Sequence, residues 1–261
     1  MPKFKTTDGV ELFYESVGEG MPLILVHPPL MGHVVFKHQR ELAKDYRLIF
    51  LDLRGHGRSD RHVQDVSMTR LREDLHDLVD HLGVQKAAIL GYSAGSAICQ
   101  AFASFYPERV SALILSGGFM KVETFMLKLE FLTGINLMKW RKRDFLSKAV
   151  AKSHGTSETD HQEIYDYAKK SDPEVVEKMY RECQYYNGLN SSWHLKEVPI
   201  LLLYGEKSHL KKHLHTFIKE LPNVKYAFIE KANHQLPTNF AGPFNSLVDR
   251  FLKSQKGPAL Q

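Results

Sequence analysis

Six short apolar runs recur along the chain, each bounded by polar or turn-forming residues. They span residues 22–26, 46–51, 86–90, 110–115, 200–204 and 224–229. A continuous apolar run of this length is typical of a strand buried on both faces of a sheet. Residues 4–16 instead alternate between apolar and polar side chains and turn at Asp8-Gly9, which predicts an antiparallel hairpin before the first buried strand.

Helical spacing of apolar residues appears between and after these runs. One helix is predicted over residues 71–82, with Gly83 as its stop signal, and another over residues 244–252. Alternating strands and helices indicate an α/β fold with a mostly parallel sheet covered by helices on both faces. The connections between its strands should be right-handed.

The alternation stops between residues 119 and 197. This stretch has no strand-like run and is predicted to form several helices, one of them beginning at Asp172-Pro173, where Asp caps the helix and Pro takes its first position. Strand-type sequence resumes at residue 198. We therefore interpret residues 119–197 as a helical cap inserted into a core of residues 1–118 and 198–261; a second small domain is the alternative.

Composition limits the classes of partner. The chain has 261 residues, 43% of them hydrophobic and 25% charged, enough for one domain with a full core, and no apolar run approaches the roughly 20 residues that cross a bilayer. The net charge is +5, but acidic residues are interspersed and no nucleic-acid motif is present. The densest basic run, residues 139–143, is interpreted as a solvated helix face. We expect a small-molecule substrate and neither a nucleic-acid nor a membrane partner; the oligomeric state is not indicated.

The two cysteines, Cys99 and Cys183, form neither a disulfide framework nor a zinc pattern. We expect both to be small packing residues in a reducing compartment. The N-terminal residues lead into alternating sequence without the apolar region of a signal peptide. A cytoplasmic location is therefore predicted.

A serine between small residues follows the strand of residues 87–90 and precedes the helix-like stretch 96–106: Gly91-Tyr92-Ser93-Ala94-Gly95. The pattern G-x-S-x-G also occurs by chance, where the serine only caps a helix. At a strand-to-helix turn, however, it is typical of a strained elbow that exposes a nucleophilic hydroxyl. The amide of Ala94 would then point to where an oxyanion forms. We predict Ser93 as the nucleophile.

With this motif the chain resembles the α/β-hydrolase superfamily over nearly its whole length. The resemblance includes Leu25-Val26-His27 followed by a turn, the segment from Asp52 to Ser59, the segment from Leu201 to Glu206, and Ala232-Asn233-His234. It implies the order nucleophile, acid, histidine, with His234 as the general base between the last strand and the final helix. We expect the polar side chains of the second segment to shape their loop: Asp52, Arg54, His56 and Ser59.

Other histidines could suggest a metal site. His209 and His213 lie at helical spacing beside Lys211 and Lys212, with His215 close by. We interpret them as a solvated helix face, because no carboxylate cluster accompanies them. No metal and no cofactor are expected.

The oxyanion loop departs from the pattern that the resemblance implies. Relatives begin this loop with His-Gly-x, and the third residue donates its amide. Here the segment is His27-Pro28-Pro29-Leu30-Met31-Gly32, and Pro29 has no N–H to donate. Leu30 is the nearest candidate, if the backbone turns one residue later.

The acid departs from the pattern as well. The resemblance places an Asp three residues after Gly205, where this chain has Ser208. A hydroxyl can orient a histidine, but it cannot neutralise the imidazolium that forms as Ser93 attacks. Glu206, next to the usual position, and Glu123, in the loop after the preceding core strand, are the alternatives. The acid is left unassigned.

The expected activity is that of a serine hydrolase, carboxylesterase-like, which cleaves a small ester through a Ser93 acyl-enzyme. A nucleophilic Asp would indicate dehalogenation or epoxide hydrolysis, but position 93 is Ser. The alternatives are a ligand-binding or regulatory protein with weakened catalysis, or another enzyme of this fold: a lyase, thioesterase or aminopeptidase. Several apolar residues of the predicted cap could line a pocket: Phe125, Met126, Leu129, Phe131, Leu132, Trp140, Tyr185, Tyr186 and Trp193.

Overall fold

An eight-stranded sheet runs through the molecule in the computed structural model, which describes residues 2–221 and 223–255. The strand order is β1-β2-β4-β3-β5-β6-β7-β8; β1 and β2 form the expected antiparallel hairpin, β2 pairs antiparallel with β4, and all later neighbours are parallel. The six apolar runs all form strands, as predicted. The bounds are β1 (Lys3–Lys5), β2 (Glu11–Val17), β3 (Met21–Val26), β4 (Tyr46–Leu51), β5 (Ala87–Tyr92), β6 (Val110–Ser116), β7 (Ile200–Gly205) and β8 (Lys225–Ile229).

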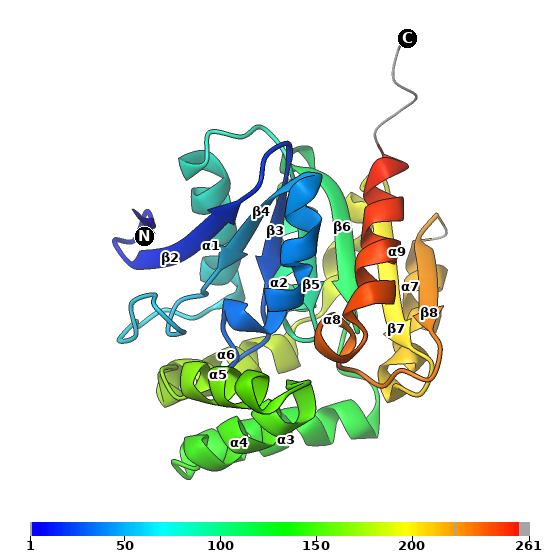
Figure 1. Ribbon diagram of the computed structural model, residues 1–261. Coiled ribbons are helices and arrows are strands. Elements are labelled where there is room, and N and C mark those ends of the chain that lie inside the picture. Colours follow the sequence, from blue (N-terminus) through cyan, green and yellow to red (C-terminus); the bar gives the residue numbers. More distant parts are fainter. Residues whose placement is uncertain (1, 222, 256–261) are drawn as a thin grey trace.

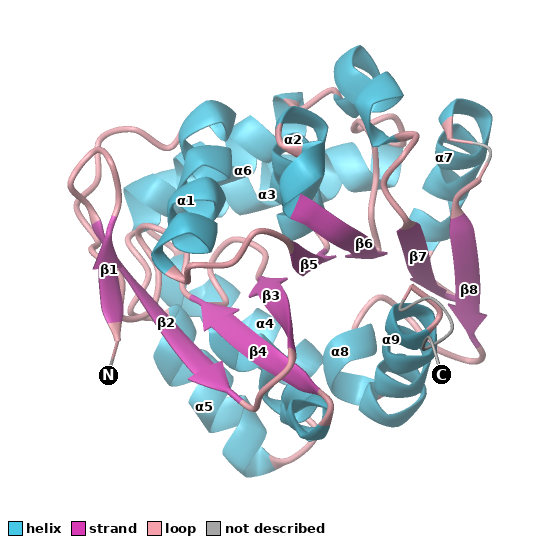
Figure 2. Cartoon of the chain, turned by 90° about the horizontal axis from the view of Figure 1, so that it is seen from above, coloured by secondary structure: helices cyan, strands magenta, loops and turns pink. Residues whose placement is uncertain are grey.

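Helices cover both faces of the sheet (Figure 2). One face packs on α1 (Met68–His81), α2 (Gly95–Phe105) and α7 (Leu214–Glu220); the other packs on the 3-10 helix η1 (His33–Lys44), α8 (Leu236–Asn239) and α9 (Ala241–Lys253). Successive strand residues point to opposite faces. Ile24 and Val26 therefore join the first core, while Leu23 and Leu25 join the second. Two short 3-10 turns, η2 (Pro107–Arg109) and η4 (His209–His213), complete the connections.

The chain between β6 and β7 is helical, as expected. It forms α3 (Phe125–Lys139), α4 (Arg143–His154), α5 (Glu158–Ala168), α6 (Pro173–Tyr185) and the 3-10 helix η3 (Gly188–Leu195). α6 begins where predicted, with the Asp172 carboxylate accepting hydrogen bonds from the amides of Glu174 and Val175. The helices α3 to α6 gather at the carboxyl ends of the parallel strands (Figure 1). None of the helices in the described ranges is both long and apolar enough to span a bilayer.

Candidate active site

Ser93 lies on a strained turn between β5 and α2. Its φ is 52°, a value that residues with a β-carbon rarely adopt, and its amide donates to the carbonyl of Ser116, 2.8 Å away. Small residues on both sides are required. A β-carbon at Gly95 would lie 2.5 Å from the carbonyl oxygen of Val26, and one at Gly91 would lie 2.7 Å from the sulfur of Cys99. The predicted strand–turn–helix context of the motif is confirmed.

His234 lies between β8 and α8 and lines the same cavity as Ser93. Its ring is 5.1 Å from that of Tyr92, whose hydroxyl donates to the His234 carbonyl at 3.3 Å. Burial, reinforced by His154 and His209, lowers the pKa of His234 to about 3. The imidazole is therefore neutral at ordinary pH and able to accept a proton. No hydrogen bond joins the two side chains in the described part of the chain, which is common before a substrate is bound.

The cavity that holds Ser93 and His234 has a volume of about 490 Å³. Its inner end is formed by Pro29, Tyr92 and Ala94, and most of its outer wall consists of apolar side chains from α3 and α4: Met126, Leu129, Phe131, Leu146 and Val150. Only three of the nine predicted cap residues belong to this wall. The others are exposed, including Phe125, Trp140, Tyr185 and Trp193, or, like Tyr186, pack on the core. The cavity is thus apolar, as expected, but through partly different residues.

The oxyanion donors differ from expectation at one position. The amide of Ala94, at the start of α2, has no acceptor among the described residues and lines the cavity. The amide of Leu30, by contrast, donates to His56 Nε2 at 2.9 Å, and the Leu30 side chain is fully buried. Leu30 is therefore wrong as a second donor in this conformation. Pro29 lines the cavity in its place and has no N–H.

None of the three acid candidates orients His234. The hydroxyl of Ser208 accepts the amide of Leu210 at the start of η4. Glu206 accepts the Lys231 amide at 2.8 Å, while Glu123 accepts the Thr216 hydroxyl at 3.0 Å and pairs with Lys121. His234 Nδ1 is buried and has no partner in the described part of the chain.

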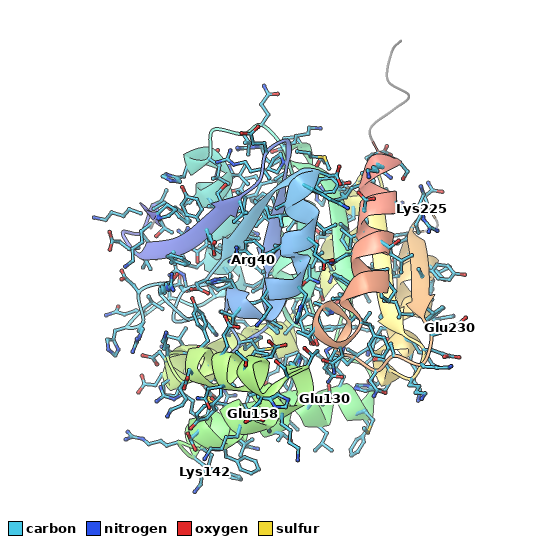
Figure 3. All side chains as sticks on the ribbon, in the orientation of Figure 1. Arg40, Glu130, Lys142, Glu158, Lys225 and Glu230 are labelled. Carbon is cyan, nitrogen blue, oxygen red and sulfur yellow. The ribbon has the colours of Figure 1, made fainter. Side chains whose placement is uncertain are left out.

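Sequence reasoning missed one carboxylate. Glu130 on α3 is the acidic residue among the described residues that line the cavity. No sequence motif identifies Glu130, because its place in the cavity wall depends on how α3 packs over the sheet. Figure 3 places Glu130 where the helical segment adjoins the core.

The loop after β4 has the structural role that was expected for it. The Asp52 carboxylate accepts hydrogen bonds from the amide of Arg58 at 3.0 Å and the hydroxyl of Tyr167 at 2.6 Å. Ser59 accepts the amide of Phe13 at 2.8 Å, and Arg54 is buried against Asp74 and Asp8. His56 Nε2 accepts a hydrogen bond from the Leu30 amide. These groups join the loop to the sheet and to α5, away from Ser93.

The interpretation as a solvated helix face holds for Lys211, Lys212 and His215, which are exposed. It is wrong for His213 and only partly right for His209. His209 Nε2 lies 2.7 Å from Glu130 Oε1. His213 is buried, with its Nε2 3.3 Å from the Thr124 hydroxyl. Over residues 2–221 and 223–255, no group of His, Cys, Asp or Glu is arranged to hold a metal ion. Cys99 and Cys183 are buried and unpaired with each other, as expected of packing residues.

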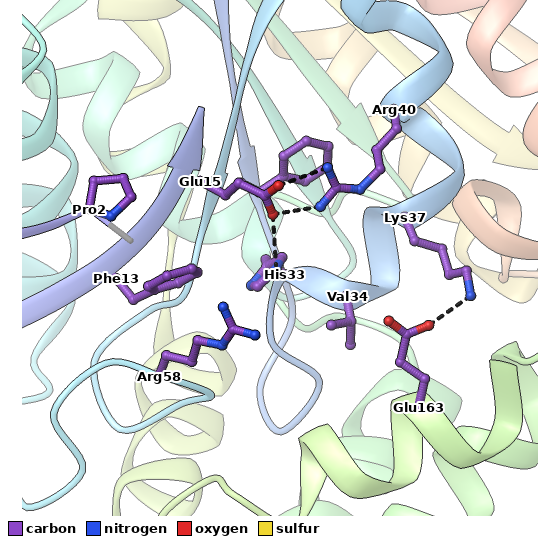
Figure 4. A pocket seen from close by; sticks show the side chains of 10 residues that line it. Pro2, Phe13, Glu15, His33, Val34, Lys37, Arg40, Arg58 and Glu163 are labelled. Carbon is purple, nitrogen blue, oxygen red and sulfur yellow. Dashed lines mark hydrogen bonds and ion pairs between the residues drawn. The ribbon is translucent and has the colours of Figure 1, made fainter. Parts of the chain in front are cut away.

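A second cavity, of about 260 Å³, lies beside η1 (Figure 4). Its charged groups pair with one another: Arg40 with Glu15, and Lys37 with Glu163. His33 approaches Glu15 at 3.9 Å. Since no Ser, Thr or Cys is among the described residues that line it, and its charged groups are engaged with one another, we place the candidate active site at Ser93.

Comparison with known proteins identifies the fold family. A family model described as the alpha/beta hydrolase fold matches residues 22–200. The chain is 25% identical to epoxide hydrolase 4 of Mus musculus, covering 95% of this chain and 77% of that protein. It is 26% identical to the serine hydrolase BPHL of Homo sapiens, covering 94% and 84%.

Solved structures agree in fold. An esterase from Exiguobacterium antarcticum superposes with a TM-score of 0.87 at 19% identity, covering 96% of this chain and 98% of that one. A thermophilic esterase from Thermogutta terrifontis superposes with a TM-score of 0.82 at 23% identity, covering 98% and 99%. The match of the family model to more than half of the sequence, together with the sheet order and the elbow at Ser93, shows that the chain belongs to the α/β-hydrolase fold family.

Proposed function

We propose that the protein is a serine hydrolase that cleaves small esters with an apolar acyl group. The observation that carries this proposal is the position of Ser93: its φ of 52° holds it on a tight, partly exposed turn, and it shares an apolar cavity with a neutral histidine. A nucleophile and a base on one cavity wall are what acyl transfer requires.

In this mechanism the Ser93 oxygen attacks the ester carbonyl while His234 Nε2 takes the hydroxyl proton. The Ala94 amide stabilises the oxyanion. His234 then returns its proton to the leaving alcohol, and a water molecule that His234 activates releases the acyl group from Ser93. The helical segment acts as a cap that supplies the acyl-binding wall and excludes water. The chemistry needs no cofactor, and the buried free thiols suit a reducing compartment such as the cytoplasm.

A second candidate is a ligand-binding or regulatory protein that retains the fold with weak catalysis. Two observations favour it: His234 Nδ1 has no partner among the described residues, and Pro29 offers no amide to the oxyanion. Epoxide opening, named for one relative, is not proposed. Position 93 is Ser, not the Asp that such chemistry would use.

Labelling with a fluorophosphonate separates the two candidates. We expect the probe to modify Ser93, activated acyl esters to give a burst of product, and Ser93→Ala to abolish both. Residual turnover should be several orders of magnitude lower than wild type. Ser104→Ala, a change at a buried serine on α2 outside the cavity lining, is the matched control and should label normally. A folded wild type with no label and no burst would leave the ligand-binding candidate.

A further inference from the structure

The base in the proposed mechanism lacks the negative partner that it needs. When His234 takes the proton of Ser93 it becomes an imidazolium, and its Nδ1 is buried without a hydrogen-bond partner in the described ranges. The titratable groups that face it are His154 from α4, His209 from η4 and Tyr92 from β5. None of these carries a negative charge at neutral pH. A buried charge without a partner is costly, so a carboxylate that acts from further away would favour turnover.

His209 is placed to connect such a carboxylate to His234. Its Nε2 lies 2.7 Å from Glu130 Oε1. A carboxylate only accepts hydrogen bonds, so this nitrogen carries a proton, and the tautomer with its single proton there has a bare lone pair on Nδ1. That Nδ1 is also buried and without a partner in the described part of the chain. His234 uses Nε2 as the base, so its own Nδ1 carries a proton. Of the two unpaired atoms, His234 Nδ1 is therefore a hydrogen-bond donor and His209 Nδ1 an acceptor.

Leu210, the neighbour of His209 in η4, packs beside the Nδ1 side of His234. A β-carbon at Gly117 would lie 2.8 Å from His234 Nδ1 and 3.2 Å from Leu210 Cδ1, so the Nδ1 side of His234 faces the start of η4. His209 immediately precedes Leu210 and immediately follows Ser208, the usual position of the acid. Glu130 reaches this point from the cap side and lines the cavity of Ser93.

We propose that Glu130, acting through His209, replaces the missing triad acid. The inference rests on the proposed serine mechanism and deepens it. As the Ser93 oxygen bonds to the acyl carbon, its proton moves to His234 Nε2. No hydrogen bond joins the two Nδ1 atoms in this structure, but catalytic hydrogen bonds often tighten only when substrate is bound. In the substrate complex the lone pair of His209 Nδ1 orients the Nδ1–H of His234, and the Glu130 carboxylate holds His209 in that tautomer. No proton moves to His209 or Glu130. Both are positioning residues.

Neutralising Glu130 tests the proposal. Glu130→Gln should lower kcat for an activated ester by roughly 10- to 100-fold, less than the about 10⁴-fold loss seen when a directly bonded acid is neutralised. KM should change little, because Gln keeps the shape of the wall. The acid limb of the pH–rate profile should move to lower pH, since loss of the carboxylate disfavours the imidazolium. Glu123→Gln removes a nearby carboxylate that bonds to Thr216 and Lys121 instead, and should behave as wild type.

Restoring an acid at the usual place gives the decisive comparison. Asp is a good helix cap, so Ser208→Asp should keep the start of η4 intact and move the acid limb to higher pH. In that background Glu130→Gln should cost less than about 3-fold. Equal losses in both backgrounds would overturn the proposal, as would a single Glu130→Gln variant with wild-type kcat and pH profile. The comparison of the single Glu130→Gln variant with wild type remains a test even if Ser208→Asp does not fold. Absence of Ser93 labelling in wild type would instead overturn the serine mechanism itself.

Discussion

Pro29 occupies the cavity wall beside Ser93 at the position where an oxyanion amide is expected. Pro29→Ala supplies a backbone N–H there at a φ that Ala accepts. Removing one oxyanion donor from another serine hydrolase costs about 10²–10³ in kcat, so we predict that adding one raises kcat by about 10-fold or more, with little change in KM. The measurement is steady-state hydrolysis of an activated ester.

Pro28→Ala is the matched control for this change. Both substitutions enlarge the freedom of the unfolded chain and should reduce stability by about 0.4–1 kcal/mol. Only the first adds an N–H at position 29. Similar unfolding midpoints with a gain in kcat confined to Pro29→Ala would support the assignment. An unchanged kcat in both would mean that the amide of residue 29 does not reach the oxyanion.

At the residue scale, the sequence predicts candidate residues that are marked by a motif or by their order along the chain. It does not predict contacts that depend on how separate loops and helices meet in the fold. Ser93 and His234 follow from a motif in its strand–turn–helix context and from their order along the chain. The engagement of Leu30 with His56 could not be predicted, because two loops from different strands meet there. Glu130 has no local signal either. It is one of three charged residues on α3, and only the folded structure shows that it lines the cavity and lies 2.7 Å from His209.

At the scale of the elements, two helices, α3 and α4, supply most of the apolar wall that we propose binds the acyl group. Ala149 on α4 lines the cavity that holds Ser93. We predict that Ala149→Trp fills the outer part of the cavity, so that kcat/KM for long acyl esters falls by about 10-fold or more while acetate esters are little affected. Losing one or two buried methylene contacts already costs about 10- to 200-fold in comparable pockets. A panel of esters with increasing acyl length measures this.

Lys152→Trp provides the control, since Lys152 is an exposed residue of α4 that does not line the cavity. It should leave the chain-length profile unchanged. If Ala149→Trp lowers the rates of acetate and long-chain esters equally, the wall formed by α3 and α4 does not bind the acyl chain.

Strands and core helices were predictable because the spacing of their apolar residues along the sequence follows from which faces are buried. Five of the six apolar runs form central parallel strands that are covered on both faces. The sixth, β8, is wrong as a strand buried on both faces: it lies at the edge of the sheet, with Tyr226 and Phe228 exposed. For residues 119–197 the sequence predicted helices, but not which of their apolar side chains are buried. Phe125 on α3 is 77% exposed although it is apolar, while Phe131 on the same helix is buried. Which apolar residues of such a segment face inward depends on how the helices pack on the sheet, and sequence spacing alone does not determine it.

At the scale of the whole molecule, the fold holds several neutral histidines in its interior. Two of them belong to loops at the carboxyl ends of strands: His27 after β3, which accepts the Leu53 amide at 3.0 Å, and His234 after β8. A third, His154, ends α4 and bonds to the Tyr92 hydroxyl at 2.9 Å. His154 thus joins α4 to Tyr92 beside the candidate site, and His27 joins two loops of the core, so the packing at these places depends on neutral imidazoles.

Burial lowers the pKa of His27 and His234 to about 3 and that of His154 to about 4, from an ordinary 6.5. The unfolded chain takes up these protons near pH 6.5, but the native state does not. The stability that the neutral forms provide is therefore fully present above pH 6.5 and is lost as the pH falls from 6.5 towards 3 or 4. Each group contributes up to about 1.4 kcal/mol per pH unit, so the three together contribute about 4 kcal/mol per unit.

We predict that the free energy of unfolding falls steeply below about pH 6, since a domain has only about 5–15 kcal/mol in total. Asp52, whose pKa is lowered to about 2 by its hydrogen-bond partners, adds its own loss only below about pH 4. Urea unfolding followed by circular dichroism, from about pH 8 to pH 5, measures the slope. His154→Gln keeps a hydrogen-bonding group beside Tyr92 but cannot titrate, so it should reduce the slope by about a third. Equal stability at pH 8 and pH 5 would contradict the prediction, because at least three buried groups would then have to be protonated in the native state.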